Sequence, residues 1–143
     1  MVKFINAEEV LALRSAVLRG HKPLAECVFP GDDLAETFHL AYFKHEEIVC
    51  VASFYAQPHE KFPGRGYQLR GMATAENYRG QGIGNQLLNF AITYLRGQKA
   101  DYLWCNARKK AYSFYKDIGF EFISPEFEIT GIGIHRQMYL KIR

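Results

Sequence analysis

The chain has 143 residues, of which 48% are hydrophobic and 23% charged, and its formal net charge is +3. This length suits a single domain, residues 1–143, with a sizeable core, and the composition excludes intrinsic disorder. The longest apolar run, Ile48 to Ala56, is too short to cross a bilayer, and no basic block indicates nucleic-acid binding. We therefore expect no membrane or nucleic-acid partner, and the mild positive charge suits a small anionic ligand.

The N-terminus and the cysteines indicate the compartment and argue against a metal. The first residues lack the apolar core and cleavage site of a secretory signal, so the sequence favours the cytoplasm. Cys27, Cys50 and Cys105 contain no close pair, which fits neither a disulfide framework nor a zinc site. The histidines show no metal-binding spacing either, so we expect reduced thiols and no metal.

The N-terminal segment predicts a strand and a helix. Val2 to Ile5 forms a short apolar strand, and Asn6 with Glu9 makes the Asn-x-x-Glu signal that starts a helix. The segment from Gly20 to Asp33 ends this helix and has a loop composition. A second short helix at residues 34–36 is left open.

Two β-rich runs follow, at residues 37–44 and 48–57. They are separated by His45-Glu46-Glu47, which predicts a β-hairpin. Residues 58–66 contain two prolines and two glycines, and we expect another turn region there.

The segment from Tyr67 to Leu95 predicts a strand, a tight glycine loop and a helix. Apolar side chains recur at helical spacing after the loop, at Ile83, Leu87, Leu88, Ala91, Ile92 and Leu95. Gly80, Gly82 and Gly84 permit positive φ and leave the backbone open to a ligand. Since a helix N-terminus offers free N–H groups and a positive dipole end, this loop is a candidate phosphate site.

The remaining elements complete an α/β pattern. Residues 101–106 form an apolar strand, Arg108 to Ile118 a helix that Gly119 ends, and residues 120–123 and 136–142 the last strands. This order predicts a mixed, mostly antiparallel sheet of about six or seven strands with helices on both faces.

Two motifs carry the functional information. A Gly-x-Gly-x-Gly loop alone is a weak signal, and the spacing here fits neither a dinucleotide-binding loop nor a P-loop. The motifs are Met72-Ala73-Thr74 with Tyr78 and Arg79-Gly80-Gln81-Gly82-Ile83-Gly84, and then Ala111-x-x-Phe114-Tyr115-x-x-x-Gly119-Phe120. In this order and spacing they resemble the GNAT superfamily of acyl-CoA-dependent N-acetyltransferases.

The resemblance implies a site for acetyl-CoA as cosubstrate. It implies that the strand at Tyr67 to Thr74 splays from the next strand and that the pantetheine arm bonds to its free main-chain groups. It places the pyrophosphate on the amides of the glycine loop. The coenzyme contacts that follow are Met72, Ala73, Thr74, Arg79, Gly80, Gln81, Gly82, Ile83, Gly84, Asn106 and Tyr115. The chain departs from the family by carrying Arg108 where many members have asparagine, with Asn106 nearest to it.

The resemblance also suggests a catalytic pair. It gives the Tyr115 hydroxyl the role of protonating or hydrogen-bonding the departing thiolate. The spacing of Tyr115 also fits a packed aromatic side chain. The strand at residues 67–74 has no acidic residue to act as base, so we nominate His135, with Glu126, Glu128 or an ordered water as rivals.

Three arginines are candidates for acceptor binding, because the first helix and the central strand flank the acceptor side in this family. Arg14, Arg19 and Arg70 could hold a carboxylate or phosphate of the acceptor. The alternative is that they are solvated or form internal ion pairs.

These features predict an N-acetyltransferase that moves acetyl from acetyl-CoA to a primary amine by direct nucleophilic attack. An acyl-enzyme at Cys105 is less favoured, and a non-catalytic acyl-CoA-binding or sensing module is the alternative from another class. The acceptor, a small molecule or a peptide, is left open, and the family is compatible with a homodimer.

Overall fold

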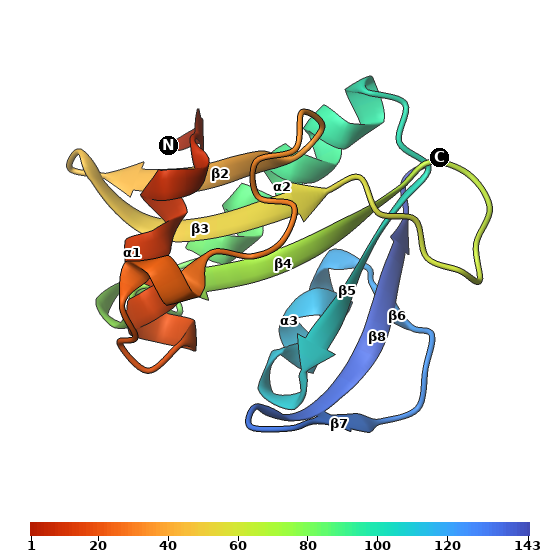
Figure 1. The fold of residues 1–143 in the computed structure, drawn as a ribbon. Coiled ribbons are helices and arrows are strands. Elements are labelled where there is room, and N and C mark those ends of the chain that lie inside the picture. Colours follow the sequence, from red (N-terminus) through yellow and green to blue (C-terminus); the bar gives the residue numbers. More distant parts are fainter.

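The structure, a computed structural model, describes residues 1–143 and contains one mixed sheet of eight strands. The strands are β1 (Val2–Ile5), β2 (Phe38–Lys44), β3 (Glu47–Tyr55), β4 (Gly66–Thr74), β5 (Tyr102–Arg108), β6 (Glu121–Phe122), β7 (Phe127–Ile129) and β8 (Gly133–Lys141). Their order is β1-β2-β3-β4-β5-β8-β6, with β7 paired to β8 (Figure 1). Only β4 and β5 are parallel, so the predicted mixed, mostly antiparallel sheet is confirmed.

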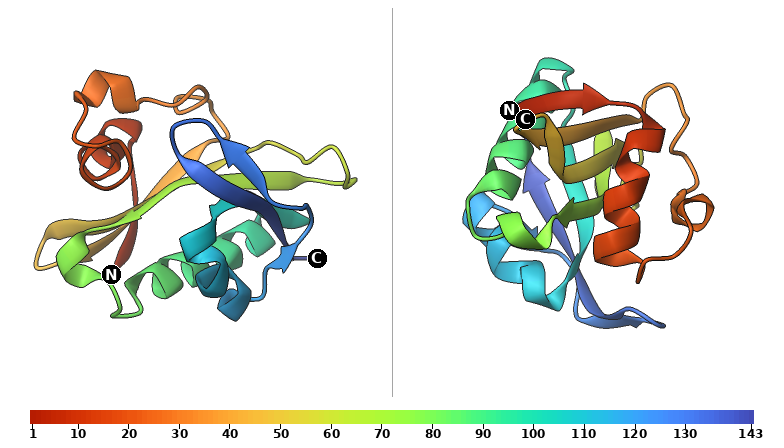
Figure 2. Two further views of the ribbon diagram at one scale, coloured as in Figure 1. Left: turned by 90° about the horizontal axis from the view of Figure 1, so that it is seen from below. Right: turned by 90° about the vertical axis from the view of Figure 1, so that its left-hand side faces the viewer.

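Helices cover both faces of the sheet, as predicted. The α-helices are α1 (Leu11–Leu13), α2 (Ile83–Gly97) and α3 (Tyr112–Ile118). Helix α1 lies between a 3₁₀ turn at Ala7–Val10 and a π turn at Arg14–Leu18, and it covers one face, while α2 and α3 lie on the other (Figure 2). Short 3₁₀ turns occupy Leu24–Cys27, Glu76–Tyr78 and Lys109–Ala111. No helix combines the length and hydropathy needed to span a bilayer.

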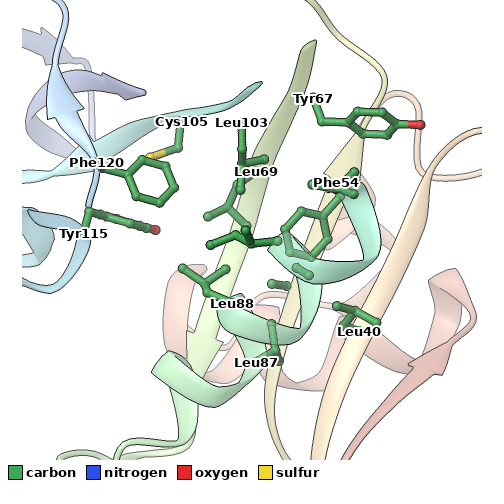
Figure 3. Packing of buried hydrophobic residues seen from close by; sticks show 14 of the residues in the cluster. Leu40, Phe54, Tyr67, Leu69, Leu87, Leu88, Leu103, Cys105, Tyr115 and Phe120 are labelled. Atoms are coloured by element: carbon green, nitrogen blue, oxygen red, sulfur yellow. The ribbon is translucent and has the colours of Figure 1, made fainter. Parts of the chain in front are cut away.

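The alternation of side chains along β3 divides the interior into two cores. Cys50, Ala52 and Phe54 face α2, whose apolar stripe includes Leu87 and Leu88 (Figure 3). Val51, which lies between them in sequence, points to the opposite face. There it packs with the first helical segment, residues 7–18. The larger core holds α2 against β2 and β3, which fixes the loop at the N-terminus of α2.

The structure corrects several predicted boundaries. The β2–β3 hairpin turns through two residues, His45 and Glu46, both at positive φ, and not through three. Residues 34–36 form turns and no helix, because neither an apolar stripe nor a cap supports one there. Arg108 ends β5 and does not begin α3. Strand β7, with only three residues, was not predicted, and it brings the sheet to eight strands.

Strands β4 and β5 separate along their length, as the resemblance implies (Figure 1). Their pairing ends at Leu69 and Cys105, although β4 continues to Thr74 and β5 to Arg108. Beside the split, β4 carries a bulge at Gly71, where its register with β3 shifts and φ is +66°. The main-chain groups of β4 that would otherwise pair with β5 are therefore free at the split.

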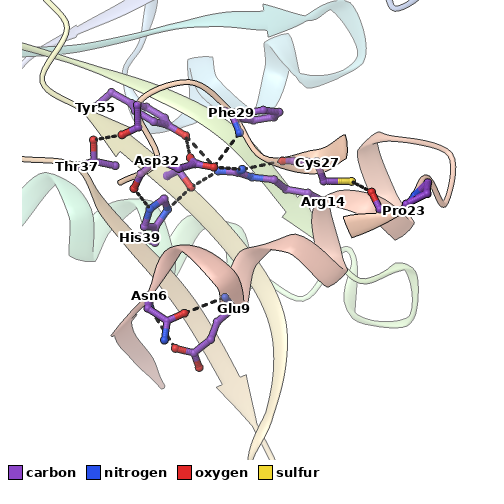
Figure 4. Close-up of polar contacts among 12 residues, drawn as sticks. Asn6, Glu9, Arg14, Pro23, Cys27, Phe29, Asp32, Thr37, His39 and Tyr55 are labelled. Carbon is purple, nitrogen blue, oxygen red and sulfur yellow. Dashed lines mark hydrogen bonds and ion pairs between the residues drawn. The ribbon is translucent and has the colours of Figure 1, made fainter. Parts of the chain in front are cut away.

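A buried polar cluster ties the first helical segment to the sheet (Figure 4). Arg14 is fully buried, and its guanidinium bonds to both carboxylate oxygens of Asp32 at 2.7 and 3.0 Å. It also donates to Ser53, Tyr55 and the Cys27 carbonyl. Burial acts to raise the pKa of Asp32, but the hydrogen bonds from Arg14 and Tyr55 outweigh it and lower that pKa to about 2. The Arg14 charge is thus neutralised inside the protein.

Candidate active site

Three adjoining cavities run along the split between β4 and β5. The loop cavity, about 460 Å³, lies between the glycine loop and α3, and its lining includes Arg79, Gly82, Phe114 and Tyr115. The central cavity, about 540 Å³, follows β4 and shares Met72, Thr74 and Tyr115 with the loop cavity. The arginine cavity, about 200 Å³, includes Arg19, Arg70, Arg108 and His135, and it shares Arg70, Asn106 and Arg108 with the central cavity. The shared residues make the three cavities one continuous cleft.

The glycine loop has an open surface at one end of this cleft. Gly80 and Gly82 have φ values of +75° and +77°, and a Cβ added to either would meet nothing within 4 Å. Gly82 is the N-cap of α2, and no side chain caps that helix. Gly84 is helical, and a Cβ there would come within 3.1 Å of Met72 Cε and 3.3 Å of Phe114 Cζ. The loop therefore presents free helix N–H groups to an open space, which suits a phosphate group.

The other predicted coenzyme residues surround this space with one exception. Met72, Ala73 and Thr74 line the central cavity along β4. Arg79 lines both the loop and central cavities, and its Nε donates to the Thr74 carbonyl at 3.4 Å. Gln81 lines none of the three cavities, because its side chain is exposed and bonds to Lys44. Only its main chain is placed to serve the loop.

Tyr115 lies where the loop and central cavities meet. Its ring packs edge-on against Phe114. It also packs tilted against Phe120 (Figure 3), so the side chain is held firmly. Only 7% of the residue is exposed, and its hydroxyl reaches Met72 Sδ at 4.0 Å, a weak contact. Burial, with the nearby Cys105 thiol, raises the pKa of Tyr115 well above its usual value. The hydroxyl therefore keeps its proton and can donate a hydrogen bond.

The cysteines near the cleft are buried thiols. Burial raises the pKa of Cys105, which lines the central cavity, and raises the pKa of Cys50 to about 11. Since the thiolate is the nucleophilic form of cysteine, both are poor nucleophiles at neutral pH.

His135 lies in the arginine cavity, on β8 opposite Arg108 of β5. Its Nδ1 lies 2.8 Å from the Gly133 carbonyl, which can only accept, so Nδ1 carries a proton. Nε2 makes no hydrogen bond and keeps a free lone pair in the neutral ring. The rival carboxylates, Glu126 and Glu128, line none of the three cavities.

The arginines expected to bind an acceptor lie in different surroundings. Arg19 and Arg70 line the arginine cavity, but Arg14 does not. The Arg14 side chain is fully buried and its terminal nitrogens are occupied by Asp32 and its neighbours, so it offers no group to an acceptor. The third arginine that lines this cavity is Arg108 and not Arg14. In the sequence, Arg108 stood out only as a departure from the family pattern. Its position at the end of a strand beside the split could have indicated that it lines the cleft.

Comparisons with known proteins show the family of the chain. The family model described as acetyltransferase (GNAT) domain matches residues 32–141. The chain is 34% identical over 143 residues to an uncharacterized N-acetyltransferase, YitI, of Bacillus subtilis, a match that covers 99% of this chain and 96% of that protein.

Solved structures share the fold at low sequence identity. The crystal structure of an aminoglycoside 6'-N-acetyltransferase complexed with coenzyme A superposes with a TM-score of 0.76 at 15% identity, covering 100% of this chain and 97% of that one. Escherichia coli ElaA superposes with a TM-score of 0.77 at 19% identity, covering 97% of each chain.

The chain belongs to the GNAT family of acetyltransferases. It is an acyltransferase whose cosubstrate is acetyl-CoA, and the open glycine loop, the free helix N-terminus and the split strands fit that coenzyme.

Proposed function

We propose that residues 1–143 act as one N-acetyltransferase domain that moves the acetyl group of acetyl-CoA to a primary amine by direct attack. The observation that carries this proposal is the continuous cleft, which joins the glycine loop to Tyr115 and then to His135. Both partners can be bound at once in such a cleft, which direct transfer requires. Release of the coenzyme thiol across a panel of amines, with the acetylated product identified, tests the proposal.

The coenzyme would lie with its pyrophosphate on the amides of Gln81, Gly82 and Gly84. The free edge of β4 at Met72 and Thr74 would hold the pantetheine arm as an added strand does. This arrangement directs the thioester toward Tyr115, where the loop and central cavities meet.

Tyr115 would hydrogen-bond the sulfur as negative charge develops on it. The raised pKa of Tyr115 keeps the hydroxyl protonated, so the donor is present throughout the neutral range. A preorganised donor aimed at developing charge stabilises the transition state more than the bound substrate. Because the Cys105 thiol stays protonated, a route through an acyl-cysteine is disfavoured.

His135 would take the proton from the acceptor ammonium before attack. Its free Nε2 and its place in the cleft support this role over Glu126 and Glu128. The charged groups that share its cavity are Arg19, which follows the π turn, Arg70 on β4 and Arg108 at the end of β5.

Replacing His135 by glutamine is expected to remove the acidic limb of the kcat/KM profile. The neutral ring is the active base, so its protonation in acid should remove activity, and glutamine has no such basic nitrogen. His45→Gln, in the exposed turn between β2 and β3, is the matched control and should keep the wild-type profile. A limb that persists at the same pH in His135→Gln assigns deprotonation to another group or to water.

Replacing Arg79 by alanine is expected to weaken acetyl-CoA binding by about 1–3 kcal/mol, the range for charge-assisted hydrogen bonds. The side chain is exposed and lines both the loop and central cavities, so its charge is close to the proposed pyrophosphate position. Calorimetric titration measures the effect, with Arg96→Ala on the exposed side of α2 as control. Equal affinities of Arg79→Ala and wild type would place the Arg79 side chain away from the phosphates.

The acceptor would enter from the arginine cavity, with Arg19 and Arg70 as its contacts. Two of the similar structures are aminoglycoside acetyltransferases. Aminoglycosides are polycations, and a cavity lined by arginines would repel them, so we do not extend that substrate to this chain.

A further inference from the structure

The arginine cavity holds cationic groups that have no partner within the protein. The structure contains two ion pairs, Arg14 with Asp32 and Lys109 with Glu126, and neither involves this cavity. The side chains of Arg19, Arg70 and Arg108 are half-buried and make no hydrogen bond or ion pair. Nε of Arg19 is buried and has no hydrogen-bond partner. All three guanidinium groups therefore keep donors free.

Acidic residues are missing from this part of the cleft. Neither the arginine cavity nor the central cavity is lined by an aspartate or glutamate, although the chain has 15 acidic residues. Lys110 adds a further positive charge to the central cavity. Like charges held together in a partly desolvated cavity repel one another, and an anionic ligand would relieve that cost.

The position of Arg70 is fixed by aromatic contacts that leave its polar atoms free. Its guanidinium carbon lies 4.6 Å from the ring centre of Phe29 and 5.7 Å from that of Tyr55. Cation–π contacts of this kind orient the planar group without using its N–H donors. Apolar side chains, among them Leu18 and Ile132, form other walls of the same cavity.

We infer that the acceptor is a small amine that carries a carboxylate or phosphate group close to the reacting nitrogen, with an apolar substituent tolerated. The inference rests on the proposed transferase function and names its substrate class. Planar guanidinium groups bind carboxylate and phosphate through paired hydrogen bonds. The anion would lie on Arg19, Arg70 and Arg108, which leaves the amine near Nε2 of His135. A polyamine or another polycation is the wrong substrate for this cavity.

A matched set of amines tests this inference. Leucine, leucinamide and 3-methylbutylamine share the amine and the apolar chain, and they differ in the carboxylate. Phosphoethanolamine and ethanolamine form the corresponding phosphate pair, and spermidine is the polycation. We expect kcat/KM to be at least about 10-fold higher for one acid or phosphate than for the matched amine that lacks the acidic group, the effect of one charge-assisted hydrogen bond. The amine of leucinamide, with a pKa of about 8, is unprotonated more often than the amine of leucine. This difference favours leucinamide as a nucleophile, so a preference for leucine would be strong evidence for an anion site.

Variants then locate the anion. Arg70→Gln and Arg108→Gln should each raise KM for the preferred acid or phosphate by about 10- to 100-fold. Each should also reduce the ratio of its kcat/KM to that of the matched amine without the acidic group. Arg96→Gln on the exposed side of α2 should change neither value. Acetyl-CoA affinity should be unchanged in all three variants, which separates acceptor binding from coenzyme binding.

Some results would overturn the inference while leaving the transferase intact. The first is equal or better turnover of spermidine or of the amines without an acidic group. The others are an unchanged preference in both arginine variants, or lost acetyl-CoA affinity in place of a raised KM. Failure of every amine to release thiol would instead contradict the transferase. The substrate class is then decided by calorimetric titration of leucine, leucinamide, phosphoethanolamine and ethanolamine into the complex with CoA, where only the compounds with a carboxylate or phosphate group should bind.

Discussion

Replacing Tyr115 by phenylalanine is expected to lower kcat by about 100-fold or more, with acetyl-CoA affinity nearly unchanged. The ring remains and keeps its packing on Phe114 and Phe120, so only the hydroxyl is lost. In the ground state that hydroxyl makes only weak contacts with sulfur, to Met72 Sδ at 4.0 Å and to the Cys105 thiol. Its contribution should therefore fall on the transition state, when charge develops on the sulfur. Steady-state kinetics with a titration of acetyl-CoA separates the two effects.

Tyr112→Phe is the matched control for this prediction. Tyr112 lies on the same helix and bonds to Glu126, outside the three cavities, so its loss should leave kcat unchanged. A Tyr115→Phe protein that loses stability or coenzyme affinity while kcat holds would assign Tyr115 a packing role.

Replacing Gly82 by glutamate is expected to abolish acetyl-CoA binding. The space beside Gly82 is open in the structure, and a carboxylate placed there would occupy and repel the pyrophosphate position. Acetyl-CoA should raise the melting temperature of the wild type, since a ligand that binds only the folded state adds about 2.7 kcal/mol of stability at 100 times its Kd. The variant should show no such shift.

Backbone strain must be separated from this effect. Gly82 has a φ of +77°, which costs a non-glycine residue about 1–2 kcal/mol. Gly131→Glu carries the same strain and charge at a φ of +81°, in the β7–β8 turn away from the loop, and should keep the shift. If Gly82→Glu is stabilised by acetyl-CoA as much as Gly131→Glu, the glycine loop is not the coenzyme site.

Local patterns predicted most of the fold. The Asn6–Glu9 capping box forms as expected, and the apolar stripe of α2 packs as its spacing indicates. These patterns are visible because each is confined to one element. Strand β7 was missed because three residues on the edge of β8 carry too short a pattern. The first helix was predicted, but its π turn at Arg14–Leu18 was not, and Arg14 in that turn pairs with Asp32, a contact between distant residues that local patterns do not show.

The sequence likewise predicts some parts of the candidate site and not others. The glycine loop and the Tyr115 motif could be read from the sequence, because their residues lie close together in the chain. The arginine cavity could not, since Arg19, Arg70 and Arg108 lie far apart in the sequence and come together only in the folded chain. Arg14 and Arg19 both lie in the predicted first helical region, and the sequence does not distinguish their roles. Arg14 has a structural role because it is buried in an ion pair with Asp32. Pairing between distant charges decides such roles, and single-sequence patterns do not reveal it.

One experiment tests the account most directly: thiol release from acetyl-CoA, followed in rapid mixing with and without an amine from the panel. Direct transfer predicts no burst of thiol without amine, steady release with it, an acetylated amine as product and no acetylated protein. A burst without amine, with acetyl on Cys105, would contradict direct attack. Acetyl-CoA binding with no acetylated product from any amine would contradict the transferase itself.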